Sequence, residues 1–521
     1  MKRRDALQVG FGSLAALVAA NAGWDKADAG ESTLAKAAKP IRLTLQETEL
    51  VVQGRNVKVL SILNSSGSLG YSPEQRAGFH VEVVNKLPVP SCVHWHGIIL
   101  PNPMDGVPFV TQKPIPPGRS YRYNFPLKQA GTYWMHSHYG MQEQHLLAAP
   151  MVIWTPEERA KASRQYVVSF SDFSFTPPEK ILANLRKPAP MAMTGMQEKH
   201  DMQSMQGTAA VKVLSQQWNQ VDQSFEKKES LGNPAKVDVA YDALLANRRT
   251  IDNPELLAVS PGETVLLRLI ASSCATNFYI DTGTLTATIL ATDGNNTKPV
   301  AGNYFQLAVA QRLDLLVTIP AEGGAFPILA QSAGRTLQAA VVLVTPGASA
   351  PSLPVQALVP TASLDGLQDL HLEPAVPLGA RPIDRELDVV LGGSMQGYRW
   401  MINDFAYPNH ESLVVKHGER VALRFKNTTA MSHPMHLHGH VFQVVEMAGS
   451  AINGPLRDTI LVPPMADCLV VLDANQPGVW AFHCHILYHA ISGMFTVLRY
   501  EGFSTKEWRP DLSAHETILK L

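Results

Sequence analysis

The chain has 521 residues, of which 45% are hydrophobic and 17% charged, a composition typical of a packed globular protein with about three domains. The formal net charge of −1 excludes the strongly basic surface expected of a protein that binds nucleic acid. Beyond the amino-terminal leader no apolar run reaches about 18 residues, so we expect no membrane span in the mature protein.

The amino terminus combines a basic start with an apolar run. Lys2, Arg3 and Arg4 precede a mildly apolar stretch from Val9 to Ala20. This order is typical of a twin-arginine export signal, and we assign residues 1–29 to the signal and leader. A short basic helix is the alternative. Export through this route would place the mature protein in the periplasm.

The first expected domain covers residues 41–157. It carries two pairs of histidines at strand spacing, His94 with His96 and His136 with His138. Alternate side chains of a strand point to the same face, so both rings of a pair would emerge together. A single pair of this kind is weak evidence, since a surface pair, a core pair or a zinc site explains it equally well.

The whole chain alternates short runs of Val, Ile, Leu and Thr with clusters of Gly, Pro, Asn and Asp, which indicates antiparallel β-sandwiches. An internal repeat supports three of them. His436 and His438 follow Gly418 by eighteen and twenty residues, whereas the same count from Gly262 reaches Ile280 and Thr282. The middle repeat therefore lacks the histidines, and we expect it to act as a spacer between the other two.

The middle domain, expected at residues 158–347, contains an insertion rich in methionine. Residues 191–205 include five methionines and one histidine, namely Met191, Met193, Met196, His200, Met202 and Met205. Thioether sulfur is a soft ligand that suits Cu(I). The alternative is a loop whose methionines have no specific role.

A segment rich in Pro, Ala, Leu and Gly, residues 348–382, is predicted to link the second domain to the third. The third domain is expected at residues 383–505, followed by a tail at 506–521. It contains two further histidine clusters, His433 with His436 and His438, and His483 with His485 and His489.

Cys484 lies between two of these histidines. In an extended segment, His483 and His485 would project to one face and Cys484 to the other. Cys484, His489, Met494 and one more histidine would form a His₂Cys site with an axial thioether, the ligand set of blue copper used for electron transfer. The two flanking histidines would then belong to a second metal site.

Ten of the 18 histidines fall in these four short segments. The segments resemble the four copper motifs of the multicopper oxidases, the family of laccases, ascorbate oxidase, bilirubin oxidase and bacterial copper-efflux and copper-resistance oxidases. The resemblance implies an all-β fold of three cupredoxin-like Greek-key β-sandwiches and four copper ions. It also implies ligand sets: His433, Cys484, His489 and axial Met494 for type 1 copper; His94 and His436 for type 2; His96, His136 and His485 for one type 3 ion; and His138, His438 and His483 for the other.

The implied reaction is the one-electron oxidation of a reductant coupled to reduction of O₂ to water, with Cys484 conducting electrons to His483 and His485. We expect a monomeric laccase-like oxidase of phenolic or diamine substrates, which also oxidises Cu(I). A dedicated cuprous or other metallo-oxidase for copper tolerance is the main alternative. A copper-sequestering protein is an alternative from a different class.

Asp105 stands where copper-efflux oxidases carry an acid that donates protons to the copper cluster, although an Asp-Gly pair is also a common turn. Ala490 replaces a glutamate that several bacterial relatives carry after the last type 1 histidine. Near the type 1 site, Met431 matches a methionine that captures Cu(I) in copper-efflux oxidases, but Thr429 stands where those enzymes have an acid.

Overall fold

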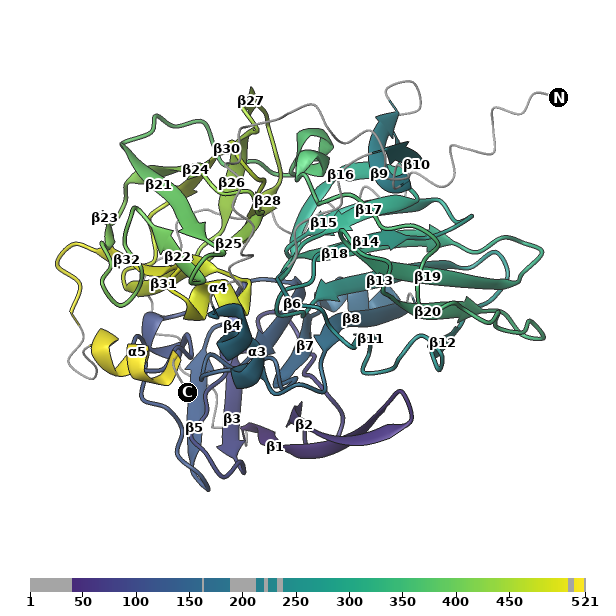
Figure 1. Cartoon of the computed structure of the whole chain (residues 1–521), viewed down its shortest axis with the longest axis horizontal. Coiled ribbons are helices and arrows are strands. Elements are labelled where there is room, and N and C mark those ends of the chain that lie inside the picture. Colours follow the sequence, from purple (N-terminus) through teal and green to yellow (C-terminus); the bar gives the residue numbers. More distant parts are fainter. Residues whose placement is uncertain are drawn as a thin grey trace, which may run out of the picture.

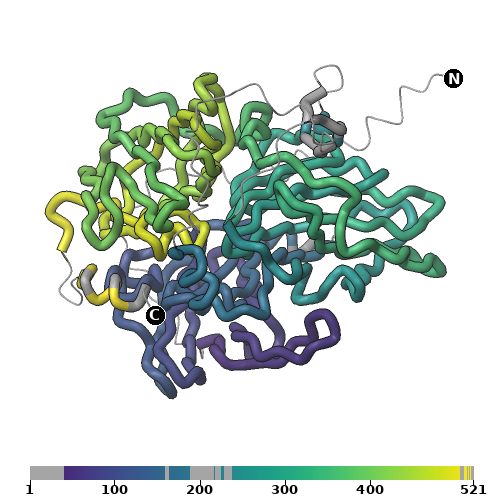
Figure 2. The backbone as a smooth tube through the Cα atoms, viewed as in Figure 1, coloured from purple at the N-terminus to yellow at the C-terminus, as the bar shows by residue number. Residues whose placement is uncertain are grey.

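The computed structural model describes residues 40–161, 164–187, 212–219, 224–231, 238–504 and 510–519. Its chain forms three β-sandwiches that meet near the middle of the molecule (Figure 1). Figure 2 follows the backbone from the first sandwich through the second to the third. The all-β class expected from the sequence is confirmed. The predicted leader and the methionine-rich segment lie outside the described residues.

The first sandwich packs a four-stranded sheet, in the order β2-β1-β3-β5, against a three-stranded sheet, β4-β6-β7. Burial alternates along β3, as expected for a strand with one face on a core. The strands are β1 (Ile41–Val52), β2 (Arg55–Leu63), β3 (Phe79–Asn85), β4 (His94–His96), β5 (Ser120–Phe125), β6 (Gly131–His136) and β7 (Ala148–Ile153).

The second sandwich has an eight-stranded sheet, β11-β8-β13-β18-β15-β16-β10-β9, and a five-stranded sheet, β12-β20-β19-β14-β17. The apolar run 265–270 lies within β13, as its composition indicates. The strands are β8 (Gln165–Phe173), β9 (Lys212–Asn219), β10 (Ser224–Leu231), β11 (Ala243–Ala246), β12 (Glu255–Ala258), β13 (Thr264–Ala271), β14 (Phe278–Asp281), β15 (Ala287–Thr292), β16 (Asn295–Gly302), β17 (Tyr304–Leu307), β18 (Arg312–Thr318), β19 (Ala325–Ser332) and β20 (Gln338–Val344).

The third sandwich packs the sheet β22-β21-β24-β30-β26-β27, with β28 on β26, against the sheet β23-β32-β31-β25-β29. Its strands are β21 (Arg385–Ser394), β22 (Arg399–Ile402), β23 (Leu413–Val415), β24 (Arg420–Asn427), β25 (His433–Leu437), β26 (Phe442–Met447), β27 (Ser450–Ala451), β28 (Leu456–Arg457), β29 (Thr459–Val462), β30 (Asp467–Asp473), β31 (Val479–Cys484) and β32 (Phe495–Tyr500).

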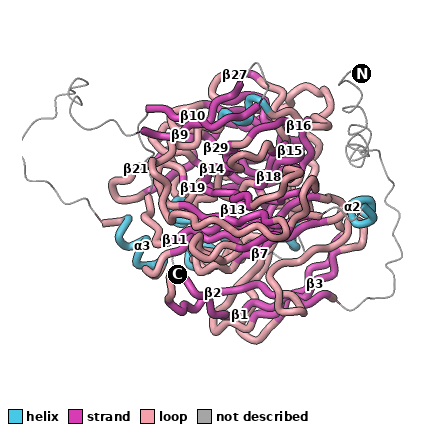
Figure 3. The backbone as a smooth tube through the Cα atoms, turned by 90° about the vertical axis from the view of Figure 1, so that its right-hand side faces the viewer, coloured by secondary structure: helices cyan, strands magenta, loops and turns pink. Residues whose placement is uncertain are grey.

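Helices are short, and strands dominate the side view in Figure 3. Within the described residues no helix is long and apolar enough to span a membrane. The helical segments are η2 (Asn102–Met104), α2 (Pro156–Lys161), α3 (Pro178–Leu185), η3 (Leu367–His371), α4 (Leu487–Ile491) and α5 (Leu512–Leu519).

The first and third sandwiches share one continuous hydrophobic core, whereas the second is built mainly around a core of its own. The shared core runs from Leu43 and Trp95 to Phe482 and Tyr500. The expected linker lies along the second sandwich, where Tyr279 donates a hydrogen bond to the carbonyl oxygen of Ser363. The two sandwiches that carry histidines are therefore packed as one unit.

Candidate metal centres

Each histidine-bearing sandwich holds its two motifs on paired strands. In the first, β4 pairs with β6, so that His94 lies opposite His136. In the third, β25 pairs with β31, which sets His436 opposite His483 and Met435 opposite Cys484. The β-ladder thus brings together motifs that are distant in sequence.

The first and third sandwiches bring their histidines face to face in one buried chamber. We define this histidine chamber by eight residues: His94, His96, His136, His138, His436, His438, His483 and His485. The ring centroids of His94 and His438 are 3.8 Å apart, and those of His96 and His436 are 3.7 Å apart. The first sandwich supplies four of the eight rings and the third supplies the other four.

Several ring nitrogens of the chamber are close enough to share a metal ion. One nitrogen from each of His138, His438 and His483 lies within 4.8 Å of the others, and the same holds for His94, His436 and His438. The first group coincides with one expected type 3 set. The second contains the expected type 2 pair.

Buried ring nitrogens without a hydrogen-bond partner among the described residues show that this donor set fits metal ions. They are His94 Nε2, His96 Nδ1, His136 Nε2, His138 Nε2, His436 Nε2 and His485 Nε2. Leaving such an atom unpaired costs about 1–3 kcal/mol. A metal ion would take these lone pairs and remove that cost.

The opposite nitrogens of several rings are already held by the protein. His94 Nδ1 donates to the carbonyl oxygen of Asp105 (2.9 Å), His436 Nδ1 to that of Asp458 (2.8 Å), and His483 Nδ1 to that of Cys484 (2.9 Å). These bonds fix the tautomer that leaves Nε2 as a lone pair. Burial also lowers the pKa of His436 well below its usual value and that of His483 to about 3. Both rings are therefore neutral at pH 7.

We expect the copper-free protein to lose stability as the pH falls below 6.5. Histidines of the unfolded chain bind protons near pH 6.5, whereas the buried rings of His96, His138 and His436 stay neutral because burial lowers their pKa well below that value. The unfolded state then binds more protons, and at pH 5 each such histidine costs about 2 kcal/mol. Urea unfolding from pH 7.5 to pH 5 measures the effect, and a flat dependence would contradict it.

Asp105 follows η2 and faces two rings of the chamber. Its Oδ1 lies 3.1 Å from His94 Nδ1, and its Oδ2 lies 3.0 Å from His438 Nδ1. Gly106 has φ of +87°, and a Cβ there would overlap the carbonyl oxygen of Val93. The Asp-Gly pair therefore makes the turn and also delivers a carboxylate to the chamber.

Glu143 is a second buried acid at the chamber, which the sequence analysis missed. Its Oε2 lies 3.0 Å from His136 Nδ1, and its Oε1 lies 4.0 Å from His485 Nδ1. Burial raises the pKa of Glu143 well above the usual carboxyl range. A carboxyl group that retains its proton can donate it. The feature of the sequence that could have indicated Glu143 is the presence of an acid five residues after His138, between Gln142 and Gln144.

The second candidate centre surrounds Cys484. His433 Nδ1 and His489 Nδ1 lie 3.1 Å apart and are 3.8 and 3.6 Å from the Cys484 sulfur. Met494 is fully buried, and its carbonyl oxygen accepts a hydrogen bond from the Cys484 backbone amide (3.0 Å). Burial raises the pKa of the Cys484 thiol, so a thiolate here needs a metal cation beside it. Two imidazole nitrogens and a thiolate sulfur suit copper.

The outer nitrogens of both histidines at this centre are engaged. Thr429 Oγ1 lies 2.7 Å from His433 Nε2. Asp238 Oδ2 accepts from His489 Nε2 (2.7 Å) and from the Tyr398 hydroxyl. Asp238 belongs to the second domain and was not expected at this site. An acid therefore lies at this centre, although it comes from the second domain and not from position 429.

A cavity of about 450 Å³ lies beside the Cys484 centre. Asp238, Met431, Ser432 and Arg335 are among its lining residues. Asp238 Oδ1 is buried and has no hydrogen-bond partner in the described part of the chain. Asp238 therefore contacts His489 through Oδ2 and also lines this cavity, and its Oδ1 can accept a further hydrogen bond.

Comparison with known proteins identifies the family. Multicopper oxidase profiles match residues 74–158, 210–348 and 381–502. The sequence is 33% identical to multicopper oxidase MmcO of Mycobacterium tuberculosis over 81% of this chain and 79% of that protein. The chain belongs to the multicopper oxidase family. A copper resistance protein A homolog of Pseudomonas syringae pv. tomato is 28% identical over 88% of this multicopper oxidase and 92% of that relative.

Solved structures show the same fold. The iron-import multicopper oxidase Fet3p aligns with a TM-score of 0.68 at 20% identity, covering 88% of this multicopper oxidase and 90% of that chain. A multicopper oxidase from Pseudomonas thermotolerans aligns with a TM-score of 0.63 at 22% identity, over 88% and 98% of the two chains. The three cupredoxin-like sandwiches are thereby confirmed. As a multicopper oxidase, the chain is an oxidoreductase that uses copper and O₂.

Three cysteines of this multicopper oxidase are not among the expected copper ligands, although the Cys92 sulfur accepts a hydrogen bond from the His138 backbone amide (3.4 Å). Cys92, Cys274 and Cys468 are buried and form no disulfide. They pack as small apolar side chains, as their strand-like surroundings indicate.

Proposed function

We propose that this multicopper oxidase is a laccase-like enzyme that oxidises phenolic or diamine substrates, and also Cu(I), one electron at a time. Its resident cofactor would be four copper ions. One would be held by His433, Cys484 and His489 with Met494 as a further ligand, and three by the histidine chamber. When bound, the copper ions supply one-electron redox chemistry at the first site and four-electron reduction of O₂ to water at the second.

Within the chamber we propose the division implied by the sequence motifs. The type 2 ion would be held by His94 and His436, and the type 3 ions by His96, His136 and His485, and by His138, His438 and His483. The unpartnered nitrogens and the grouping of His138, His438 and His483 support this division.

The domain boundaries given above are also proposals. The residue ranges matched by the three multicopper oxidase profiles overlap the three proposed domains.

The chain supplies a direct covalent connection between the two centres. Cys484 is flanked by His483 and His485. One peptide bond on each side therefore joins Cys484 to a histidine of the chamber. The chamber also has two acids, Asp105 and Glu143, that can hold the protons needed to form water. Glu143 extends the proton supply beyond the single residue expected from the sequence.

The observation that carries the proposal is the position of Asp238. Its Oδ2 binds His489, while its unpartnered Oδ1 belongs to a residue that lines the cavity. A phenol or an amine that gives up an electron also becomes more acidic and must release a proton. Asp238 can accept that proton at the place where a reductant can come near His489.

We expect Asp238→Asn to lower kcat/KM for a phenol or an aromatic diamine by about 10²-fold, because the amide cannot take up the proton. Oxidation of ferrocyanide, which releases no proton, should be unchanged. O₂ uptake under fixed copper measures both. Asp242→Asn is the matched control, since Asp242 lines the same cavity but accepts hydrogen bonds from Ser174 and Phe175.

The same assay separates the alternatives. Phenol oxidation that requires added copper would indicate a dedicated cuprous oxidase instead of a laccase-like enzyme. Copper binding with negligible O₂ uptake would indicate a sequestering protein. Equal losses for phenol and ferrocyanide in the Asp238 variant would refute its role in proton uptake.

Cu(I) remains in the proposal because of two observations. Met431 lines the cavity beside the Cys484 centre, where its thioether can contact a Cu(I) substrate. Relatives are named copper resistance protein A. The methionines of residues 191–205 would add further soft ligands, but they lie outside the described residues.

We propose the periplasm as the compartment, on the strength of the twin-arginine pattern in residues 1–29. We also propose that the enzyme is a monomer and that it binds no nucleic acid, and the net charge of −1 supports the second point.

A further inference from the structure

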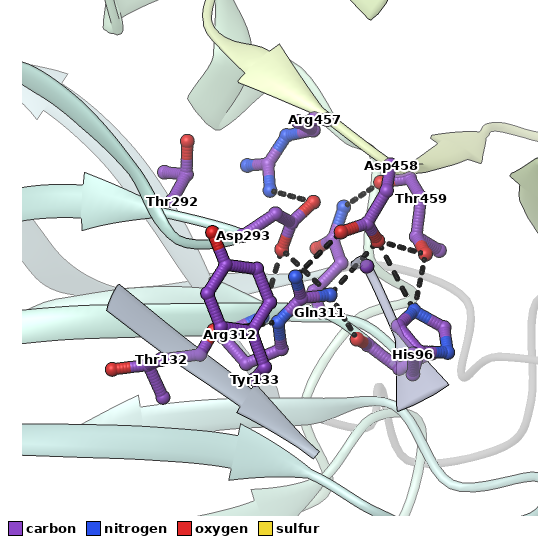
Figure 4. Close-up of polar contacts among 12 residues, drawn as sticks. His96, Thr132, Tyr133, Thr292, Asp293, Gln311, Arg312, Arg457, Asp458 and Thr459 are labelled. Carbon is purple, nitrogen blue, oxygen red and sulfur yellow. Dashed lines mark hydrogen bonds and ion pairs between the residues drawn. The ribbon is translucent and has the colours of Figure 1, made fainter. Parts of the chain in front are cut away.

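Five charged side chains form a buried cluster where the three sandwiches meet, shown in part in Figure 4. They are Asp293 and Arg312 of the second sandwich, Arg457 and Asp458 of the third, and Asp369 of the linker. All five are at most 6% exposed by side chain. Burying charges carries a large desolvation cost, so each must be well paired.

Asp458 lies between β28 and β29 and contacts one ring from each half of the histidine chamber. Its Oδ1 lies 3.1 Å from His96 Nε2, and its backbone carbonyl oxygen accepts from His436 Nδ1 (2.8 Å). A carboxylate only accepts hydrogen bonds, so His96 carries its proton on Nε2 and leaves Nδ1 as a lone pair. Nδ1 is the nitrogen of His96 that has no partner among the described residues.

Arg312, at the start of β18, holds the Asp458 carboxylate from the second sandwich. Its Nη1 donates to Asp458 Oδ1 (2.8 Å) and its Nη2 to Oδ2 (2.5 Å). The guanidinium is itself fixed, because its Nε donates to the carbonyl oxygen of Thr132 (3.2 Å) and the group lies over the Tyr133 ring. A bidentate arginine sets the plane of a carboxylate as well as its position.

A glycine next to His96 leaves room for the ion pair of Arg312 and Asp458 beside the chamber. Gly97, directly after His96, has φ of +84°, and a Cβ there would overlap both Asp458 and Arg312. Behind the pair, Asp293 Oδ1 accepts from the Arg312 backbone amide (2.9 Å), and Asp293 Oδ2 accepts from Arg457 (3.3 Å). Asp293 Oδ1 also lies 3.7 Å from Arg312 Nη1, so Asp293 contacts both the backbone and the guanidinium of Arg312.

We propose that Arg312 is a positioning residue for the histidine chamber, acting through Asp458 on the ring orientation and tautomer of His96 and on the placement of His436. This inference rests on the proposed role of those histidines as copper ligands. It gives the second sandwich, which contributes none of the proposed ligands of the four copper ions, a direct part in building the chamber.

Arg312→Lys tests the proposal, because lysine keeps the charge but cannot form the two parallel hydrogen bonds. We expect copper in the chamber to bind about 10- to 100-fold more weakly, as is typical when a group that orients a metal ligand is lost. The blue absorbance of the Cys484 centre should stay unchanged. Copper titration followed by the electron paramagnetic resonance signal of the non-blue copper measures the difference.

Arg268→Lys is the matched control. Arg268, in β13, is equally buried and binds Asp314 and Glu158, but it contacts no ring of the chamber. A purely structural role would make both variants lower the melting temperature while leaving the affinity for chamber copper unchanged. Equal chamber affinity in Arg312→Lys and Arg268→Lys would therefore overturn the proposal.

Asp458→Asn provides an independent variant if Arg312→Lys does not fold. The amide can donate to His96 Nε2 and so favour the tautomer with a proton on Nδ1. The proposal expects weaker chamber copper here too, and wild-type affinity would overturn it. A wild-type protein that binds no chamber copper would instead refute the proposed function itself.

Discussion

Replacing Cys484 by serine should abolish the blue absorbance, at about 600 nm for this class of ligand set, and should reduce O₂ uptake to background. A serine hydroxyl does not provide the soft thiolate that the site requires. His483 and His485 remain in place, so the chamber should keep its copper. The expected preparation is colourless and contains one copper ion fewer per chain, as measured by absorbance and metal analysis.

Cys274→Ser is the control for this experiment. Cys274 is also buried, but its backbone amide binds Asp172 and its thiol lies outside the candidate centre. It should retain both colour and activity. A Cys484→Ser protein that stayed blue would show that the sulfur ligand is another residue.

Replacing Asp105 by asparagine should slow O₂ reduction by about 10²- to 10⁴-fold, the range typical for loss of a group that transfers protons. The amide retains the size of the carboxyl group but cannot donate the proton. Reduction of the blue centre by a phenol without O₂ should stay as fast as in the wild type, because Asp105 faces only the chamber. Stopped-flow absorbance and O₂ uptake separate the two steps.

Asp172→Asn controls for the introduction of a buried amide. Asp172 is a buried carboxylate that accepts from the backbone amides of Cys274, Ala275 and Thr276, away from the chamber rings. Normal O₂ uptake in Asp105→Asn would assign proton supply to Glu143 alone. In that case Glu143→Gln should show the full loss.

The sequence allowed prediction of the residues that face each other within one motif. Pairs such as His94 and His96 lie on a strand, and the alternation of side chains along a strand is a local property. The same alternation predicted that the side chain of Cys484 points away from those of His483 and His485. In the structure Cys484 lies opposite Met435 on β25. The β-sandwich class followed from short apolar runs divided by turn residues, as at 265–270.

The groups around the rings could not be predicted in this way. Asp238 reaches His489 only because the second domain packs against the third. Arg312 reaches Asp458 for the same reason. Asp238 and Arg312 both lie in segments without any histidine pattern. Their positions depend on how whole domains pack, which no local period in the sequence records. The middle domain was expected to be a spacer, yet it contributes side chains to both candidate centres.

The continuous core shared by the first and third sandwiches has a consequence for biosynthesis. The ribosome makes the strand with His94 early and the strand with His483 late, so the whole chamber cannot be completed until both strands have been made. The second sandwich, with its own core, can fold while synthesis continues. The eight histidines can therefore meet only after the third sandwich has emerged and docked. Under the proposed ligand assignment, metal loading is a late step in maturation.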